Sequence, residues 1–391
     1  RGMSERVIVH EGLNVFAEHA EKWNSLLERA GNPSFFLRAD WLNCWAKHWA
    51  ENRKTMLVVV ERNGEWIGGL PLILGKGRIG ARWKVQKLEF AGVPFYDRME
   101  LPAATAKDCE RSLELILQWM QRDLKSWTAL GLHEVPNGSH TLNAFKSISR
   151  KRGFELHTVL ASKAPLLDLH GGGKTSSKYR RQLRQSMERL MERGKVETDF
   201  FSVNSQDIES LIQECSAVES VSWKGKQGVG IFRNEGFRKF MLDVWKILAP
   251  EKGIALATIR LDGNLIIYHW GFRHGDRFLS YNMAQTPETN NIRGGSLILN
   301  LMVDKGLELG FSRIDASRGS LTSPNVIGRY HGPIRDHGNL VVYGPGLKSR
   351  GLSFLRHRAL PIIRKLRKLP RPPVLEEKSE ITDLPCTNES A

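Results

Sequence analysis

Apolar and polar positions follow the same order in the two halves of the chain. Two dipeptides, Asn63-Gly64 and Asp262-Gly263, each separate a pair of strand-like apolar runs, at residues 56–60, 66–74, 254–261 and 265–272. Such dipeptides between apolar runs indicate a β-hairpin, because both central residues of a type I′ turn have positive φ. The pattern therefore predicts one hairpin in each half.

The segments around the two hairpins also correspond. An aromatic-rich stretch precedes each hairpin, and a strand, an amphipathic helix and a further strand follow it. We expect the helices at 108–125 and 296–309, and the last strands at 127–135 and 311–316. This order predicts an α/β (α+β) fold with two tandem domains, each a mixed sheet flanked by helices. The alternative to an internal duplication is a chance recurrence of hairpins and helices.

Residues 176–193, between the halves, place apolar residues three and four positions apart, which predicts an amphipathic helix that ends at Gly194. Its apolar stripe consists of Tyr179, Leu183, Met187, Leu190 and Met191. We therefore predict an N-terminal domain, a basic linker helix, a C-terminal domain, and a basic amphipathic segment with a disordered tail from about Pro372, over residues 7–172, 173–195, 196–346 and 347–391.

The net charge of +16 is concentrated in two short stretches. Residues 174–195 contain eight basic and two acidic residues, and residues 337–375 contain nine basic and no acidic residues. The composition, 41% hydrophobic and 26% charged, is typical of a globular protein and excludes disorder over the whole chain. No helix-turn-helix or zinc-finger pattern accompanies the charge, so we expect no sequence-specific nucleic-acid binding.

Other sequence patterns limit the cellular compartments and the types of reaction that are expected. No apolar run approaches the roughly 20 residues that a membrane-spanning helix needs, and no secretory signal is recognisable, so we expect a cytoplasmic protein. Four cysteines lie far apart without a C-x-x-C pair, which predicts reduced, mostly buried thiols and no metal site. Walker, Rossmann and H-E-x-x-H motifs do not occur, which argues against nucleotide hydrolysis, dinucleotide binding and zinc proteolysis.

The best candidate for a ligand site is a glycine turn before the second predicted amphipathic helix. Arg293-Gly294-Gly295-Ser296 leads directly into the apolar run 297–302. Such a turn exposes backbone N–H groups at the positive end of the helix dipole, where a phosphate or pyrophosphate binds well, and Arg293 can add an ionic contact. The corresponding residues 101–106 of the first half have no glycine. We therefore expect the anion site in the second half alone.

These residues resemble the acetyltransferase family related to the cellulose-biosynthesis protein CelD, within the GNAT superfamily. The family pattern has a D-G hairpin turn, a strand that ends in an aromatic and a small polar residue, a glycine turn before a helix, and a D-x-x-R-G segment. Here those features are Asp262-Gly263, Ser280-Tyr281-Asn282, Arg293-Gly294-Gly295-Ser296-Leu297 and Asp315-Ala316-Ser317-Arg318-Gly319. The chain departs from the pattern at Ser323-Pro324-Asn325, where members usually have a Tyr-Lys pair.

The resemblance implies an N-acyltransferase that takes its acyl group from acetyl-CoA or another acyl-CoA and needs no metal. It places the cofactor on Arg293, Gly294, Gly295, Ser296 and Asn282. Candidate acids and bases are His269, Glu219, Asp315 and Tyr281, although a core histidine, a solvated or capping glutamate, a capping aspartate and a packed tyrosine are the structural alternatives. The acceptor, an amine of a sugar, a polysaccharide precursor or another small metabolite, is expected near Trp223, Arg318 and Tyr330.

Two other functions stay open at this point. A Fem-type aminoacyltransferase has a similar double-GNAT layout but uses aminoacyl-tRNA, whose phosphates the basic linker helix would contact. The alternative without catalysis is a degenerate GNAT-like binding module at a membrane surface or on nucleic acid. Independently, apolar and basic residues alternate over 347–371, although Pro361 would kink a helix there. We therefore predict reversible peripheral contact of this segment with the inner face of a membrane.

Overall fold

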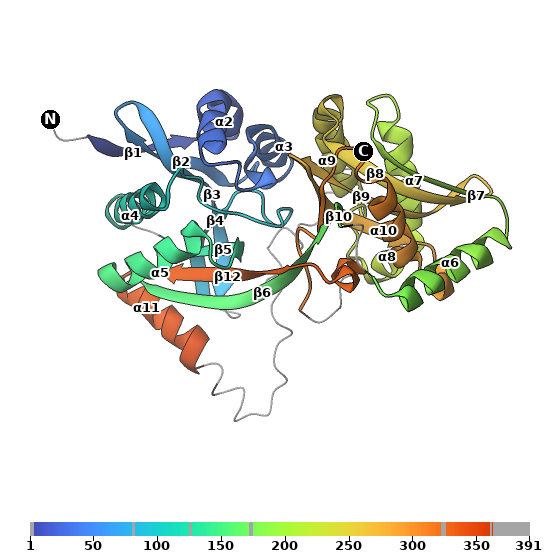
Figure 1. Cartoon of the computed structure of the whole chain (residues 1–391). Helices are drawn as coiled ribbons and strands as arrows, with labels where there is room; N and C mark the ends of the chain where they lie inside the picture. The colour runs from blue at the N-terminus through green and yellow to red at the C-terminus, as the bar shows by residue number, and fades with distance from the viewer. Residues whose placement is uncertain are drawn as a thin grey trace, which may run out of the picture. The chain divides into compact units, whose positions relative to one another are not determined.

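The computed structural model describes residues 4–79, 83–124, 127–171, 175–321, 326–359 and 362. The chain forms two compact units, whose elements Figure 1 labels. Unit 1 comprises residues 1–160 together with 338–391, and unit 2 comprises residues 161–337. These limits differ from the expected boundaries at 172 and 346, and the basic helix falls inside unit 2. The predicted disordered tail lies outside the described residues.

Unit 1 is built on a mixed sheet with the strand order β1-β2-β3-β4-β5-β12-β6. Strands β1 to β4 pair antiparallel, and β4 and β5 pair in parallel. The strands are β1 (Glu5–Glu11), β2 (Lys54–Arg62), β3 (Glu65–Ile79), β4 (Trp83–Phe90), β5 (Ala129–Pro136), and parts of β6 (Glu155–Asp168) and β12 (Ile334–Tyr343). The helices are α1 (Val15–Glu18), α2 (Ala20–Arg29), α3 (Ala39–Trp49), α4 (Ala106–Arg122), α5 (His140–Arg152) and α11 (Leu347–Phe354).

Unit 2 repeats this arrangement with the strand order β12-β6-β11-β10-β9-β8-β7. Strands β7 to β10 pair antiparallel, and β10 and β11 pair in parallel. Its own strands are β7 (Val196–Ser202), β8 (Ile254–Leu261), β9 (Asn264–His274), β10 (Arg277–Gln285) and β11 (Arg313–Asp315). The helices are α6 (Ser177–Met191), α7 (Ile208–Val221), α8 (Trp223–Gln227), α9 (Glu235–Leu248) and α10 (Gly294–Lys305).

The two predicted hairpins and the order of elements are confirmed. Asn63 and Gly64 join β2 to β3, Asp262 and Gly263 join β8 to β9, and all four residues have positive φ, as a type I′ turn requires. The predicted α/β fold class is confirmed as well. The helix corresponding to 296–309 begins two residues earlier and ends at Lys305. Cys44, Cys109 and Cys215 are buried free thiols, as expected, and Cys386 lies outside the described residues.

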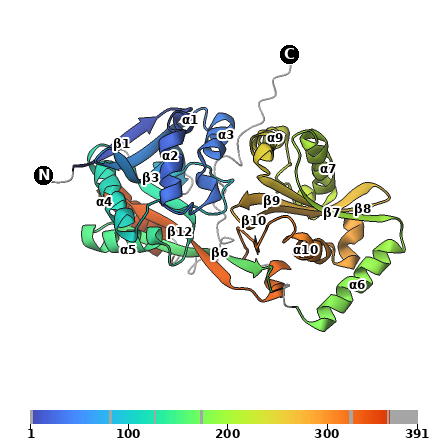
Figure 2. The ribbon, with the colours of Figure 1, turned by 45° about the horizontal axis from the view of Figure 1, so that its top comes forward.

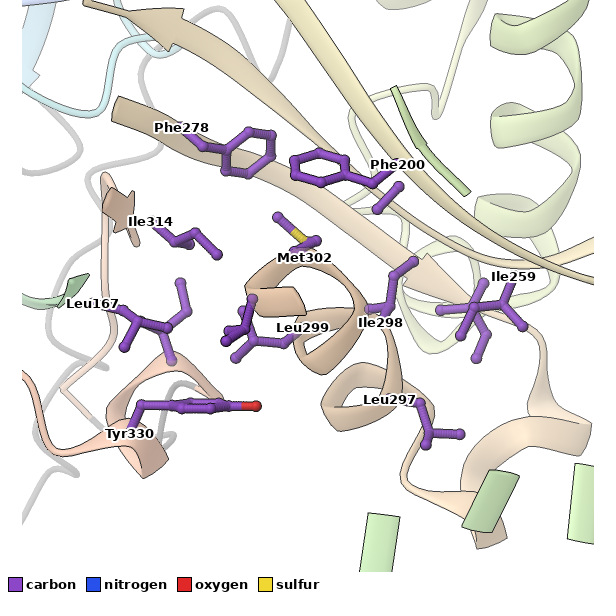
Figure 3. Close-up of a cluster of buried hydrophobic side chains, with 14 of the residues drawn as sticks. Leu167, Phe200, Ile259, Phe278, Leu297, Ile298, Leu299, Met302, Ile314 and Tyr330 are labelled. Carbon is purple, nitrogen blue, oxygen red and sulfur yellow. The ribbon is translucent and has the colours of Figure 1, made fainter. Parts of the chain in front are cut away.

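Helix α10 crosses one face of the unit 2 sheet and forms its core there (Figure 3). Leu297, Ile298, Leu299 and Met302 of this helix are at most 3% exposed. They belong to a cluster with Phe200, Ile259, Phe278 and Ile314, one from each of four strands. A helix buried on most of its surface owes its position to this packing, since truncating one such side chain typically costs about 2–5 kcal/mol. The packing fixes where the start of α10 lies.

Helices α7 and α9 cover the opposite face of the unit 2 sheet, as Figure 2 shows. Trp245 of α9 packs edge-on against Trp270 of β9, with ring centroids 5.1 Å apart. Because side chains alternate along a strand, neighbouring residues of β9 and β10 point to different helices. We call the two sides the α10 face and the α7 face.

In the part of the chain that the structure describes, no helix is both long and apolar enough to cross a membrane.

Candidate active site

The central feature of unit 2 is a split between β10 and its parallel neighbour β11. The two strands pair from Arg277↔Arg313 to Leu279↔Asp315 only, whereas β10 continues to Gln285. Strand β11 ends there because the chain turns, with Ser317 at φ 59° and its N–H donating to the Asp315 carboxylate at 2.9 Å. Peptide groups of β10 beyond Leu279 are therefore left without a strand partner on that edge among the described residues. An extended ligand can pair with such an edge.

A pocket of about 210 Å³ opens beside this split, on the α10 face. Strands β9 and β10, helix α10, and the short 3₁₀ turn η4 (Val326–Tyr330) form its walls. Its lining residues are His269, Ser280, Met283, Gly295, Leu299, Val326 and Ile327. The lining is mostly apolar with one polar pair, which is typical of a pocket that holds an uncharged chain and orients it through a few hydrogen bonds.

The start of α10 reaches the pocket and keeps backbone donors available. Arg293 precedes the helix in the left-handed conformation, with φ 55° and ψ 45°, and its carbonyl accepts from the amides of Ser296 and Leu297. No hydrogen bond within the described residues uses the amides of Gly294 and Gly295. Helix α4 of unit 1 differs, because the Thr105 side chain caps its first turn. The predicted anion site thus has open donors in unit 2.

A side chain at either position would crowd neighbouring side chains. A Cβ on Gly294 would collide with the Gln285 side chain, and one on Gly295 would lie 3.1 Å from Cε of Met283. The sequence prediction for this turn therefore has a steric basis, since glycine leaves the backbone open to a close approach by a ligand. Ser296 is buried, and Arg293 is exposed at the rim of the turn.

His269 and Ser280 form the polar pair of the pocket, with Nε2 of His269 2.6 Å from Oγ of Ser280. Burial, and to a smaller extent the charge of Lys224, lowers the pKa of His269 to about 3. The imidazole is therefore neutral at physiological pH and accepts a proton only weakly, which disfavours its predicted role as general base. Nδ1 of His269 is buried without a partner among the described residues.

A network of buried polar groups lies on the α7 face, centred on Glu219. One carboxylate oxygen accepts from the amide of Phe232 at 2.6 Å, and the other from Nδ2 of Asn282 at 2.8 Å and from the Tyr268 hydroxyl at 3.4 Å. Glu219 is only 2% exposed. The two structural alternatives for this residue, a solvated side chain and a simple helix cap, therefore do not fit. These three donors fix the orientation of the carboxylate.

Lys224 completes this network, and no local sequence pattern pointed to it. Its Nζ donates to Oδ1 of Asn282 at 2.5 Å, at the bulge that separates Ser280 from Asn282 along β10. Burial lowers the pKa of Lys224 below its ordinary value, and the nearby Glu219 carboxylate offsets only part of this effect. Ser222 positions the lysine, because its side chain caps helix α8 through the Lys224 amide. Tyr268, Ser280 and Met283 were missed in the same way.

The remaining candidates lie at different distances from this centre. Tyr281 packs on the α7 face, with its ring 5.0 Å from Trp270 and 4.8 Å from Phe272, so it does not line the pocket. Trp223 is 59% exposed at the start of α8, next to Lys224. An aromatic side chain so exposed is available to a ligand.

Asp315, Arg318 and Tyr330 belong to the walls around the split. Asp315 is fully buried and forms an ion pair with Arg335, which accounts for its charge without a catalytic role. Arg318 is exposed beyond the end of β11. Tyr330 is 4% exposed in the core behind α10, and burial raises its pKa. Ser323-Pro324-Asn325, where the family pattern differs, lie outside the described residues.

Comparison with known protein families identifies a domain within unit 2. Residues 177–322 match the family model described as an acetyltransferase (GNAT) domain. This range includes the glycine turn, the Glu219 network and five of the seven residues that line the pocket, whereas Val326 and Ile327 lie beyond it. No curated protein matches the chain. The CelD-like relationship therefore stays a prediction.

Solved structures resemble the chain over most of its length. FemX shares 10% identity at a TM-score of 0.56, covering 86% of this chain and 98% of that one. A conserved protein of unknown function from Bacteroides thetaiotaomicron shares 11% identity at a TM-score of 0.54, and the match covers 86% of this chain and 100% of that one. A tandem GNAT protein from the clavulanic acid biosynthesis pathway shares 12% identity at a TM-score of 0.50, and the match covers 88% of this chain and 100% of that one. Such identities establish the fold alone: the chain has a GNAT acyltransferase fold.

Proposed function

We propose that the protein is an acyl-CoA-dependent N-acyltransferase whose reaction takes place at the split between β10 and β11. The observation that carries the proposal is the coincidence of three features at one point: the unpaired edge of β10, the pocket on the α10 face, and the open amides of Gly294 and Gly295. The amides and Arg293 would hold the pyrophosphate of the cofactor, and its extended arm would lie along β10 beside the pocket.

The acceptor amine would approach from the α7 face. Glu219 is the negatively charged group of the network there, and Lys224 fixes Asn282 at the β10 bulge. In the reaction, the neutral amine nitrogen attacks the thioester carbon, the carbon–sulfur bond breaks, and the amine loses one proton while the thiolate gains one. We propose Glu219 as the group that accepts the amine proton, because the neutral His269 is too weak a base.

Trp223 supports a sugar as the acceptor. Its exposed ring lies next to Lys224 in sequence, at the start of α8. Aromatic rings present a broad apolar surface with a polar edge, which suits the face of a sugar ring, and the amine would then be directed toward Glu219. Tyr281 stays a candidate for protonating the thiolate, which would require the thiolate to be reached from the α7 face.

Isothermal titration calorimetry with CoA and acetyl-CoA tests the cofactor site. We expect binding by the wild-type protein and none by Gly295→Glu, whose carboxylate would fill the pocket and repel the pyrophosphate. Gly171→Glu is the matched control, because a Cβ at Gly171 meets nothing within 4 Å. Absence of binding in the wild type, or equal binding by both variants, would refute the proposal. Release of free thiol with a panel of amino sugars then tests the acceptor.

One observation favours aminoacyl-tRNA as a second candidate donor. Lys178, Arg180, Arg181 and Arg184 are all exposed along α6, and none of them pairs with a carboxylate among the described residues. Helix α6 packs against α10 and against the turn η3 (Pro287–Ile292), so its charges lie near the glycine turn. Fluorescence anisotropy with labelled tRNA decides between the donors: Arg180→Gln/Arg181→Gln should weaken tRNA binding strongly and leave acetyl-CoA binding unchanged if tRNA is used.

A further inference from the structure

Helix α11, in unit 1, has an unusual distribution of side chains between its two sides. The side against the sheet buries Ser349, Leu352 and Ser353, which are 5%, 2% and 1% exposed. The solvent side presents Leu347, 90% exposed, and Phe354, 58% exposed, which lie seven residues apart and therefore on the same side. A surface helix normally places its large apolar residues inward. This helix buries two serines and exposes its phenylalanine.

The helix is nevertheless held firmly in this orientation. Leu352 packs in a cluster with Val85, Ala129 and Tyr343, and the Ser353 hydroxyl lies 2.9 Å from Nε2 of His157. His357, in the π turn η5 (Leu355–Ala359) that follows, stacks on His157 with ring centroids 3.6 Å apart. The exposure of Leu347 and Phe354 is thus set by contacts of the opposite side. Turning the helix over would break those contacts.

Basic residues surround the exposed apolar side chains. Lys348, Arg350 and Arg358 are exposed, and none of the ion pairs between described residues includes them. Ile362, 59% exposed, extends the apolar set. No acidic residue occurs anywhere in the sequence from 337 to 375. Apolar groups that insert, flanked by cations without counterions, match the chemistry of an anionic lipid surface.

We propose that α11 and the following turn form a docking surface for a membrane with anionic headgroups. Leu347, Phe354 and Ile362 would enter the boundary between headgroups and acyl chains, while Lys348, Arg350 and Arg358 contact lipid phosphates. The surface belongs to unit 1 and is independent of the acyltransferase site proposed in unit 2. Its function is to hold the enzyme at the membrane rather than to take part in the reaction.

Co-sedimentation of the full chain with vesicles tests this surface. The probes are vesicles of phosphatidylcholine alone and vesicles with about one third phosphatidylglycerol. We expect binding to the anionic vesicles only, and at least about a tenfold loss of partitioning for Leu347→Glu/Phe354→Glu. The control Leu307→Glu/Ile334→Glu makes the same charge change at residues that are 45% and 59% exposed in unit 2. Circular dichroism of each variant verifies its fold.

A charge series separates this surface from unspecific adsorption of a basic protein. Lys348→Gln/Arg350→Gln should weaken partitioning by about 25-fold, since each basic residue near an anionic leaflet contributes about fivefold. Arg180→Gln/Arg181→Gln removes the same charge from α6 and should leave partitioning nearly unchanged. Equal losses in the two variants would overturn the proposal. The proposal would also be overturned if the wild-type protein did not bind anionic vesicles. The same holds if light scattering showed a dimer of the wild type that Leu347→Glu/Phe354→Glu dissociates.

Discussion

Replacing Glu219 should destabilise unit 2 by an amount that its hydrogen bonds determine. The carboxylate is the acceptor for the buried amide of Phe232 and for Nδ2 of Asn282, at 2.6 and 2.8 Å. A buried donor that loses its acceptor costs about 1–3 kcal/mol. Glu219→Ala removes the acceptor of these two short hydrogen bonds and of the longer one from the Tyr268 hydroxyl. The two short bonds alone predict that it lowers the free energy of unfolding by about 2–6 kcal/mol. Glu219→Gln keeps one oxygen and should lower it by about 1–3 kcal/mol.

Urea denaturation followed by tryptophan fluorescence measures these differences. Trp245 and Trp270 lie in the core on the α7 face of unit 2 and contribute to this signal. The control is Glu214→Gln on the same helix, which removes a partly exposed ion pair with Arg260 and should cost at most about 1 kcal/mol. Equal shifts for Glu219→Gln and Glu214→Gln would refute the network as described. Acyl transfer by Glu219→Gln, measured below its denaturation midpoint, should fall at least about 100-fold if Glu219 accepts the proton.

Three further predictions follow from other parts of the structure. Met302→Ala should lower the free energy of unfolding by about 2–5 kcal/mol, whereas exposed Leu307→Ala should change it by less than about 0.5 kcal/mol; similar losses in calorimetry would contradict the core assignment. Gly294→Ala should weaken CoA binding in titration calorimetry, because its Cβ would displace the Gln285 side chain, and unchanged affinity would count against the glycine turn. Burial lowers the pKa of His157 in the folded state, so its contribution to holding η5 is complete above pH 6.5 and decreases as the pH falls through the lower, folded-state value. Hydrogen exchange over 347–359 should therefore speed up between pH 7.5 and 5.5 beyond the intrinsic pH dependence, and His157→Gln should remove the excess.

Much of the fold could be predicted because it depends on local signals. The Asn63-Gly64 and Asp262-Gly263 turns adopt the backbone that their residue types favour, and the stripe of α6 follows from helical spacing alone. The glycine turn was found for the same reason, since the absence of side chains is visible in a sequence. The limits of the compact units could not be predicted in this way, because β6 and β12 each pass from one unit to the other without any change in composition.

The Glu219 network could be predicted only in part because it depends on tertiary contacts. Lys224 reaches Asn282 across 58 positions of sequence, and nothing in its local pattern distinguishes it from the solvated Lys226 two residues later. Asp315 was selected as a candidate base, but Arg335, 20 residues away, pairs with it. Burial likewise changes what His269 can do, and a single strand pattern does not reveal how much solvent its imidazole loses.

Strand β12 has a consequence for the order in which the chain can fold during synthesis. It lies between β5 and β6 in the strand order, yet it is made about 180 residues after β6 begins. Unit 2 can therefore fold on the ribosome while unit 1 still has two unpaired strand edges, which are prone to aggregate. A fragment that stops before β12 keeps those edges permanently. Any expression of unit 1 by itself would need the C-terminal segment rejoined to residue 160, for example by a short linker that replaces unit 2.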